Sequence, residues 1–253
     1  MVIARLREGA RDPNEVAREL DLLAEDVRRH AGDGAGPEEL AQAIDHELFA
    51  VRGFHGNSGD YAAPENSYLD VVVERRTGIP ITLSLVYMEV AQRVGLRCDP
   101  VGYPSHFIVR CGDPESPIYV DPFNQGVRLD RAELLAQLHG LNLNGAHPES
   151  FLAAITRRQV LQRMLNNLHA VFRTRRDLER WLAVVELHLV LEPWNAQLVG
   201  ERGMLHYRLG RPSQALSDLE RYVTASEPRT VSSGALRLLD ELRLRYGGNE
   251  EES

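Results

Sequence analysis

The segment Pro80–Val94, which lies between Gly78 and Gly95, restricts the fold of this chain more than any other part of the sequence. Pro80 suits the first turn of a helix, because its missing amide would have no intrahelical partner there, and glycine commonly ends a helix. Apolar residues cover most of the helical circumference instead of a single stripe. The sequence therefore predicts a helix that is buried on nearly all sides, and other elements must pack around it.

Helices are expected before this segment and short strands after it. Apolar residues recur at helical spacing within residues 16–27 and again within residues 40–51. A third helix is expected to start at Ser67, whose hydroxyl would cap it, and Asp70 three positions later would complete a capping box. Residues 97–111 and 116–124 combine β-branched and aromatic residues with turn residues, which is typical of short strands. This order of elements predicts an α+β fold.

The second half of the chain is predicted to be helical from Arg131 onward and contains an internal repeat. Two similar segments, which end near Ala196 and Thr230, place Pro193 and Pro228 thirty-five residues apart, close to the 34-residue period of a tetratricopeptide repeat. The expected division of the chain is residues 1–150, a repeat segment at 151–247 and an acidic tail at 248–253.

The two repeats differ in quality. Gly203 and Ala215 are small residues placed where two helices of such a repeat cross, whereas Trp181 stands where the first repeat should have a small residue. Two repeats cannot bury a solenoid core alone. We therefore expect them to pack on the preceding domain or on a final helix at about residues 235–246.

The segment from residue 78 to residue 124 resembles the core of the transglutaminase-like superfamily, which has a papain-like α+β fold with a small antiparallel sheet. In that family a cysteine opens a helix, a histidine lies on one strand and an aspartate lies on the next. Pro80 stands here at the position of the cysteine, His106 matches the histidine and Asp121 matches the aspartate. The usual acyl transfer is lost, because proline offers neither a nucleophile nor a backbone donor.

One branch of this superfamily, the SirB-type proteins, is similar over residues 48 to 228. That branch joins such a core to C-terminal tetratricopeptide-like repeats. Asn66 with Ser67, the run Glu74–Arg76 and the run Gly78–Pro80 recur in it. The name of the branch records a proposed regulatory association, and no established reaction comes with the fold. The resemblance thus implies a transglutaminase-like core followed by an all-α repeat segment.

The candidate catalytic residues are His106 and Asp121. Thr82 and Ser84 offer hydroxyls on the right helix, but their displacement along it is expected to point them away from His106. His106 and Asp121 could also form a buried pair that joins two strands, and we favour this structural or ligand-binding role over a working dyad. The candidate cleft residues are Asn66, Glu74, Pro80, Ser84 and Asn124.

Composition argues against several classes of function. The net charge of -8 disfavours non-specific nucleic-acid binding, and every one of the 29 basic residues is an arginine. The chain contains no phosphate-loop or dinucleotide-binding motif, and His139 and His147 lack familiar ligand spacing. No cofactor and no metal are therefore expected. For the arginine-rich residues 157–176 we favour a solvated helix face over a surface for an acidic partner.

Location and cysteine state follow from simpler patterns. No apolar run is long enough to span a bilayer, and the first residues lack an apolar signal core. We expect no membrane association and a cytoplasmic location. Cys98 and Cys111 are too few for a disulfide framework, so we expect both to be reduced.

Three hypotheses of function remain. The leading one is a catalytically altered or inactive protein that binds another protein or peptide through its helical repeats and acts in interaction or regulation. The second is a hydrolase or acyltransferase in which His106 acts as general base and Asp121 orients it. The third is a structural module whose cleft is filled by side chains.

Overall fold

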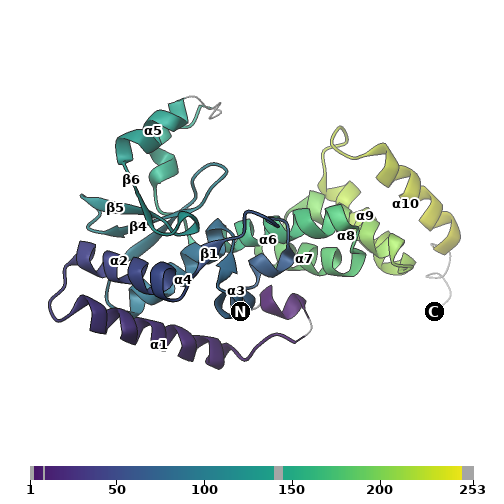
Figure 1. Ribbon diagram of the computed structural model, residues 1–253. Coiled ribbons are helices and arrows are strands. Elements are labelled where there is room, and N and C mark those ends of the chain that lie inside the picture. The colour runs from purple at the N-terminus through teal and green to yellow at the C-terminus, as the bar shows by residue number, and fades with distance from the viewer. Residues whose placement is uncertain (1–2, 8, 140–144, 247–253) are drawn as a thin grey trace. The chain divides into compact units, whose positions relative to one another are not determined.

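The computed structural model describes residues 3–7, 9–139 and 145–246 (Figure 1). It divides into two compact units, Met1–Met164 and Leu165–Ser253. The division falls within α6 (Arg157–Arg175), later than the boundary at residue 150 that was expected from the sequence. The expected acidic tail at residues 248–253 lies outside the described residues.

Helical elements surround a small sheet in the first unit. α1 (Pro13–Ala31) begins where the carboxylate of Asp12 accepts a hydrogen bond from the amide of Asn14, which satisfies one free amide of the first turn. The other helical elements are α2 (Pro37–Asp45), a π-helical turn (His46–Val51), α3 (Leu69–Arg75), α4 (Pro80–Arg93), α5 (Arg131–His139) and 3₁₀ turns at Ile3–Leu6, Pro64–Ser67, Pro122–Asn124 and Pro148–Leu152.

The strands form an antiparallel sheet of the expected kind. β3 (Cys98–Val101), β4 (Ile108–Gly112), β5 (Pro117–Asp121) and β6 (Val127–Leu129) pair in that order. Two shorter strands, β1 (His55–Gly56) and β2 (Thr77–Gly78), pair in parallel apart from this sheet. The prediction of an α+β core with a small antiparallel sheet is confirmed.

The buried helix predicted from the sequence is α4. Both α1 and α2 pack against it, and β4 contacts it as well. Val109 and Val120 belong to the same apolar cluster as the helix, and the hydroxyl of Tyr87 donates to the carbonyl of Ala41 at 3.3 Å. The buried residues of α4 are Pro80, Ile81, Thr82, Leu83, Ser84, Val86, Tyr87, Val90 and Ala91.

The two cysteines form a disulfide, so the prediction of two reduced thiols is wrong. Cys98 on β3 lies directly opposite Cys111 on β4, and their Cα atoms are 4.1 Å apart. Directly opposed residues on neighbouring antiparallel strands bring their side chains close enough to be bridged. The bond could not be predicted from the sequence, because it depends on the register of two strands.

The start of α3 also differs from the prediction. The helix begins two residues later than expected, with Tyr68 at the N-cap position, and Ser67 instead ends a 3₁₀ turn. Asp70, which was expected to complete a capping box, is fully buried. Its carboxylate accepts hydrogen bonds from the guanidinium of Arg7 at 2.5 Å and from the amide of Arg11 at 3.1 Å. A long-range contact has therefore replaced a local one.

The second unit is all-α, and its helices pair as the repeat predicts. Gly203 on α8 permits a close approach, because an added Cβ would lie 3.1 Å from Asp218 and 3.3 Å from the carbonyl of Ala215 on α9. Among the described helices, none has the length and apolar character needed to cross a membrane. The helices that follow α6 are α7 (Leu178–Leu191), α8 (Ala196–Arg208), α9 (Pro212–Ala225) and α10 (Ser233–Tyr246).

The last helix completes the packing of this unit. α10 contacts α9 and buries Ala235, Leu238, Leu239 and Leu242. This packing is one of the two that were expected for a pair of repeats too short to bury a core alone. Trp181, the bulky residue of the first repeat, is also buried.

Candidate functional site

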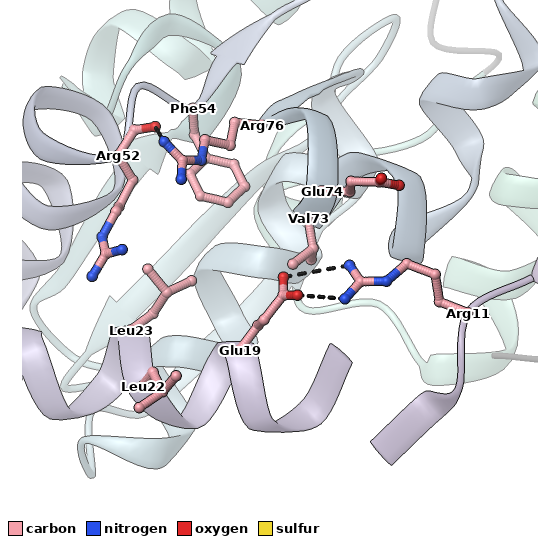
Figure 2. A pocket seen from close by; sticks show the side chains of 9 residues that line it. All are labelled: Arg11, Glu19, Leu22, Leu23, Arg52, Phe54, Val73, Glu74 and Arg76. Carbon is pink, nitrogen blue, oxygen red and sulfur yellow. Dashed lines mark hydrogen bonds and ion pairs between the residues drawn. The ribbon is translucent and has the colours of Figure 1, made fainter. Parts of the chain in front are cut away.

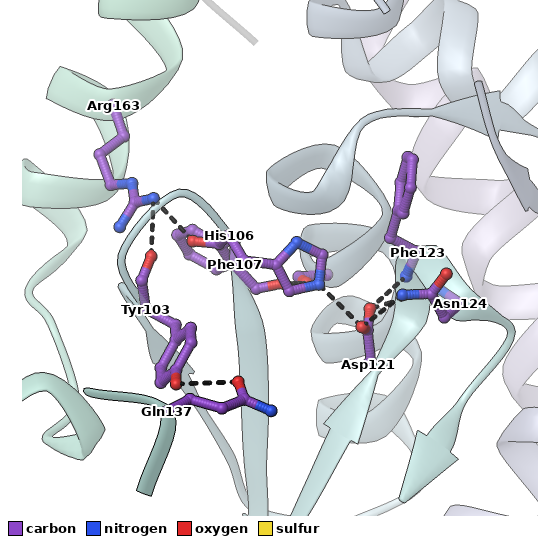
Figure 3. A network of polar contacts seen from close by, with 9 residues as sticks. Tyr103, His106, Phe107, Asp121, Phe123, Asn124, Gln137 and Arg163 are labelled. Atoms are coloured by element: carbon purple, nitrogen blue, oxygen red, sulfur yellow. Dashed lines mark hydrogen bonds and ion pairs between the residues drawn. The ribbon is translucent and has the colours of Figure 1, made fainter. Parts of the chain in front are cut away.

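His106 and Asp121 form a hydrogen-bonded pair, with 2.7 Å between Nε2 of the imidazole and Oδ2 of the carboxylate (Figure 3). His106 precedes β4 and Asp121 ends β5, so neighbouring strands bring the two side chains together. The carboxylate is buried, whereas 25% of the imidazole side chain is exposed. Among the described residues, Nδ1 of His106 has no hydrogen-bond partner. The hydrogen-bonding capacity of this atom is therefore unused within the described part of the chain.

Four hydrogen bonds hold the carboxylate of Asp121. Oδ1 accepts from the amides of Phe123 at 3.1 Å and Asn124 at 3.2 Å, and Oδ2 accepts from Nδ2 of Asn124 at 2.7 Å as well as from His106. Burial raises the pKa of Asp121, but the hydrogen bonds from His106 and Asn124 outweigh it, so its pKa lies below the ordinary value. An ionised Asp121 keeps the proton of a neutral imidazole on Nε2 and leaves a lone pair on Nδ1.

Arg163 holds the loop that carries His106. Its Nη2 atom donates to the carbonyls of His106 at 2.7 Å and Tyr103 at 3.3 Å, and its guanidinium lies 5.3 Å from the ring centroid of Phe107. Ser105 has a φ of 58°, a left-handed conformation that is uncommon for residues other than glycine. From the sequence, Arg163 was expected to lie on a solvated helix face. Its contacts depend on tertiary structure, so the sequence pattern of the helix did not predict them.

Pro80 occupies the first turn of α4 and is buried. The two hydroxyls that follow it are engaged with backbone groups. Thr82 is fully buried and donates to the carbonyl of Asn66 at 2.8 Å. Ser84 is also fully buried and donates to the carbonyl of Phe107 at 3.4 Å. Both act as packed polar groups that tie α4 to its surroundings.

Asn66 braces a loop near the histidine. Its Nδ2 atom donates to the carbonyls of Asp60 at 2.8 Å and Tyr61 at 3.2 Å. The ring of Tyr61 lies 6.3 Å from the ring of Phe123, which in turn lies 6.1 Å from the imidazole of His106. Asn66 therefore supports the aromatic surroundings of the pair without touching it.

Glu74 lies apart from this group. It is exposed at the end of α3 and lines a separate pocket of about 450 Å³ (Figure 2). Of the predicted cleft residues, Asn124 contacts Asp121 directly, whereas Ser84 contacts only the backbone beside His106. Within the described part of the chain, no three His, Cys, Asp or Glu side chains gather in a way that could hold a metal ion.

The repeat unit contains a groove of about 410 Å³. Arg173 on α6 and Arg208 on α8 line it, and neither guanidinium has a hydrogen-bond or ion-pair partner among the described residues. Glu201 also lines it, but its Oε1 accepts from Nε2 of His169 at 2.8 Å and from Nε1 of Trp181 at 2.9 Å. The charge of Arg173 also helps to lower the pKa of Glu201, so the lining sets two guanidiniums against one carboxylate and the groove has a net positive charge. Its remaining surface includes Gly200, Met204, Leu205, Tyr222 and Ala235.

Each of the two units corresponds to a match with a known protein family. Residues 14–166 match the model of the transglutaminase-like superfamily, and residues 168–240 match a tetratricopeptide repeat. The first match covers more than half of the chain, which therefore belongs to the transglutaminase-like superfamily. The combination of core and repeats is the one expected for the SirB-type branch.

Individual relatives support this placement. The chain is 37% identical over 186 residues to a UPF0162 protein of Xylella fastidiosa, an alignment that covers 72% of this chain and 66% of that protein. It is 29% identical over 214 residues to Protein SirB1 of Salmonella typhimurium, covering 83% and 77% of the two chains. It is also 31% identical over 185 residues to human F-box only protein 21, covering 68% of this chain but only 28% of that protein.

Proposed function

We propose that this chain is a catalytically altered transglutaminase-like protein that acts as an interaction or regulatory module. Pro80 stands where the family's nucleophilic cysteine is expected, and the nearby hydroxyls of Thr82 and Ser84 are engaged with backbone carbonyls. The observation that carries the proposal is the groove of the repeat unit, since it joins an apolar surface to the unpartnered guanidiniums of Arg173 and Arg208.

The occupant that best fits this groove is an acidic polypeptide segment with at least one apolar side chain. Carboxylates would pair with Arg173 and Arg208, because arginine offers several donors in a planar fork that matches a carboxylate. The apolar side chain would cover Met204 and the small surface at Gly200. Glu201 is bonded to His169 and Trp181, and the charge of Arg173 also acts on it, so the groove opposes two guanidiniums with one carboxylate and keeps a net positive charge.

A displayed peptide library tests this proposal. Peptides enriched on the purified full chain are expected to be acidic with apolar positions, and fluorescence anisotropy then measures their affinity. The double variant Arg173→Ser/Arg208→Ser should weaken binding about tenfold or more, since each lost charge-assisted bond is worth about 1.5 kcal/mol or more.

The control is the double variant Arg221→Ser/Arg245→Ser, which removes the same charge at positions where 59% and 65% of the side chains are exposed. Neither residue lines the groove. Enrichment of peptides without acidic character, or equal affinity of both double variants, would refute the acidic partner.

A second candidate function rests on the open nitrogen of His106. With its ring oriented by Asp121, Nδ1 could take a proton from water or from a substrate hydroxyl while the resulting oxygen attacks a carbonyl. The imidazolium would then return the proton to the leaving group. Such a hydrolase or acyltransferase needs no nucleophile from the protein.

A screen of peptide, ester and amide substrates tests this second candidate. Turnover that falls about a hundredfold or more in His106→Ala and falls also in Asp121→Asn would establish it. Ser84→Ala serves as the control, because among the residues that the structure describes its hydroxyl donates only to the carbonyl of Phe107. Turnover that is unchanged in His106→Ala would show that His106 and Asp121 take no part in catalysis.

A further inference from the structure

The pocket of Figure 2 lies within the first unit and does not include His106 or Asp121. Its volume of about 450 Å³ falls in the range of small-molecule sites. Its apolar surface combines buried side chains with Leu22, which is 58% exposed and so presents carbon that a ligand could cover. The apolar lining consists of Leu22, Leu23, Phe54 and Val73.

Several charges around this pocket are already compensated. Arg11 pairs with Glu19 through both terminal nitrogens of its guanidinium. Arg52 donates from Nε to Glu47 at 2.6 Å and from Nη2 to Asp26. These pairs supply a polar rim, but each charge within them already has a partner of opposite sign.

Two other charges are left open. The carboxylate of Glu74 makes no hydrogen bond and no ion pair within 4 Å among the described residues, although its charge helps to raise the pKa of Arg11 from farther away. Arg76 gives one N–H to the carbonyl of Arg52 at 2.9 Å, and its other donors have no partner within the described part of the chain. Figure 2 shows Arg76 and Glu74 on opposite sides of Val73. Arg76 has a φ of 57° because it caps the end of α3, where its amide donates to the carbonyl of Val72.

We propose that this pocket binds a zwitterionic small molecule of amino-acid or dipeptide size with an apolar side chain. The ammonium group pairs with Glu74, the carboxylate pairs with Arg76, and the side chain covers Leu22. A ligand of this kind satisfies both open charges at once, whereas a simple acid or amine satisfies only one. The site is independent of the peptide groove on the repeat unit.

Isothermal titration of the full chain tests the pocket. The probes are leucine and leucyl-leucine, compared with leucinamide, which lacks the carboxylate, and 4-methylpentanoate, which lacks the ammonium group. N-acetyl-leucyl-leucinamide lacks both charges. We expect at least one of the two zwitterions to bind, and each single-charge analogue to bind about tenfold or more weakly than that zwitterion.

The variants Glu74→Gln and Arg76→Gln should each weaken binding of the same zwitterion about tenfold. Arg75→Gln is the matched control, because Arg75 lies between them in sequence and does not line the pocket. Melting temperatures establish that each variant is folded, which matters because Arg76→Gln also removes the bond to Arg52. The leucinamide titration examines the same carboxylate contact in the unaltered chain.

Two results would overturn the proposal. One is no heat with either zwitterion at millimolar concentration. The other is binding of the doubly capped dipeptide as tight as that of leucyl-leucine, which would mean that only apolar contact is recognised. Because Glu74 and Arg76 are remote in sequence from Arg173 and Arg208, a failure here leaves the peptide groove untouched.

Discussion

At the scale of single residues, Pro80 and His106 stand at two positions of one family motif, but only His106 is the residue that the family is expected to have there. Pro80 fills the first turn of α4, whereas His106 keeps its 2.7 Å hydrogen bond to Asp121. The pair is therefore complete in geometry although the expected nucleophile is missing. If Pro80 occupies the nucleophile position, replacing it with cysteine should create a thiol whose reactivity depends on His106.

The variant Pro80→Cys tests that position. Both native cysteines are bonded to each other, so the new thiol is the only free one. At pH 6.5 we expect iodoacetamide to alkylate it about tenfold faster than in Pro80→Cys/His106→Ala, because a neighbouring imidazolium stabilises a thiolate. Equal alkylation rates in the two variants would show that position 80 does not lie beside His106.

Asp45 is a second residue whose surroundings change its chemistry. It ends α2, and its Oδ2 atom lies 2.7 Å from Nη1 of Arg128. Burial raises the pKa of Asp45 from 3.8 to about 6, although the charge of Arg128 acts in the opposite direction. Between these two pH values the folded protein binds the proton more tightly than the unfolded chain does. The free energy of unfolding therefore falls as pH rises from about 4 to 6.

Asp45→Asn should remove this part of the pH dependence. The shift corresponds to about 2 to 3 kcal/mol, which the wild type loses between pH 4 and 6 and the variant keeps. Urea unfolding at several pH values measures the difference. Glu38→Gln is the comparison, because Glu38 also contacts Arg128 but its side chain is 50% exposed. Parallel curves for Asp45→Asn and wild type would contradict the prediction.

At the scale of elements, close contact between α8 and α9 depends on residues without large side chains. A Cβ added to Gly200 would lie 2.7 Å from the ring of Tyr222, and one added to Gly203 would lie 3.3 Å from the carbonyl of Ala215. Gly200 also lines the groove of the repeat unit. The same absence of a side chain thus sets the packing of two helices and the depth of a binding surface.

Gly200→Ala should lower the free energy of unfolding by about 1 to 3 kcal/mol, because the buried ring of Tyr222 must move. Gly234→Ala on α10 is the matched control, since an added Cβ there meets nothing within 4 Å and should stabilise the helix by up to about 1 kcal/mol. Urea unfolding followed by circular dichroism compares the two. A Gly200→Ala variant as stable as wild type would show that the ring of Tyr222 moves aside without loss of stability.

At the scale of the whole molecule, patterns confined to one element were predictable. The all-round apolar character of α4 predicted its burial, and the spacing around Gly203 predicted a helix crossing. Features that join distant segments were not predictable from their own sequence. Nothing in the sequence distinguishes Arg163 from the other arginines of α6, although it bonds the loop of His106. Glu74 was expected in the same cleft as the histidine, but it lines a separate pocket.

The disulfide of the first unit bears on where the protein is made. A cytoplasmic location remains a prediction from the sequence, while a persistent bond between Cys98 and Cys111 is more typical of oxidising compartments. The chain has no other cysteine, so each molecule carries either two free thiols or none. The bonded form weighs two hydrogen atoms less than the open form. An intact mass of protein taken directly from cells would therefore record the redox conditions that the chain met there, before any partner or substrate is known.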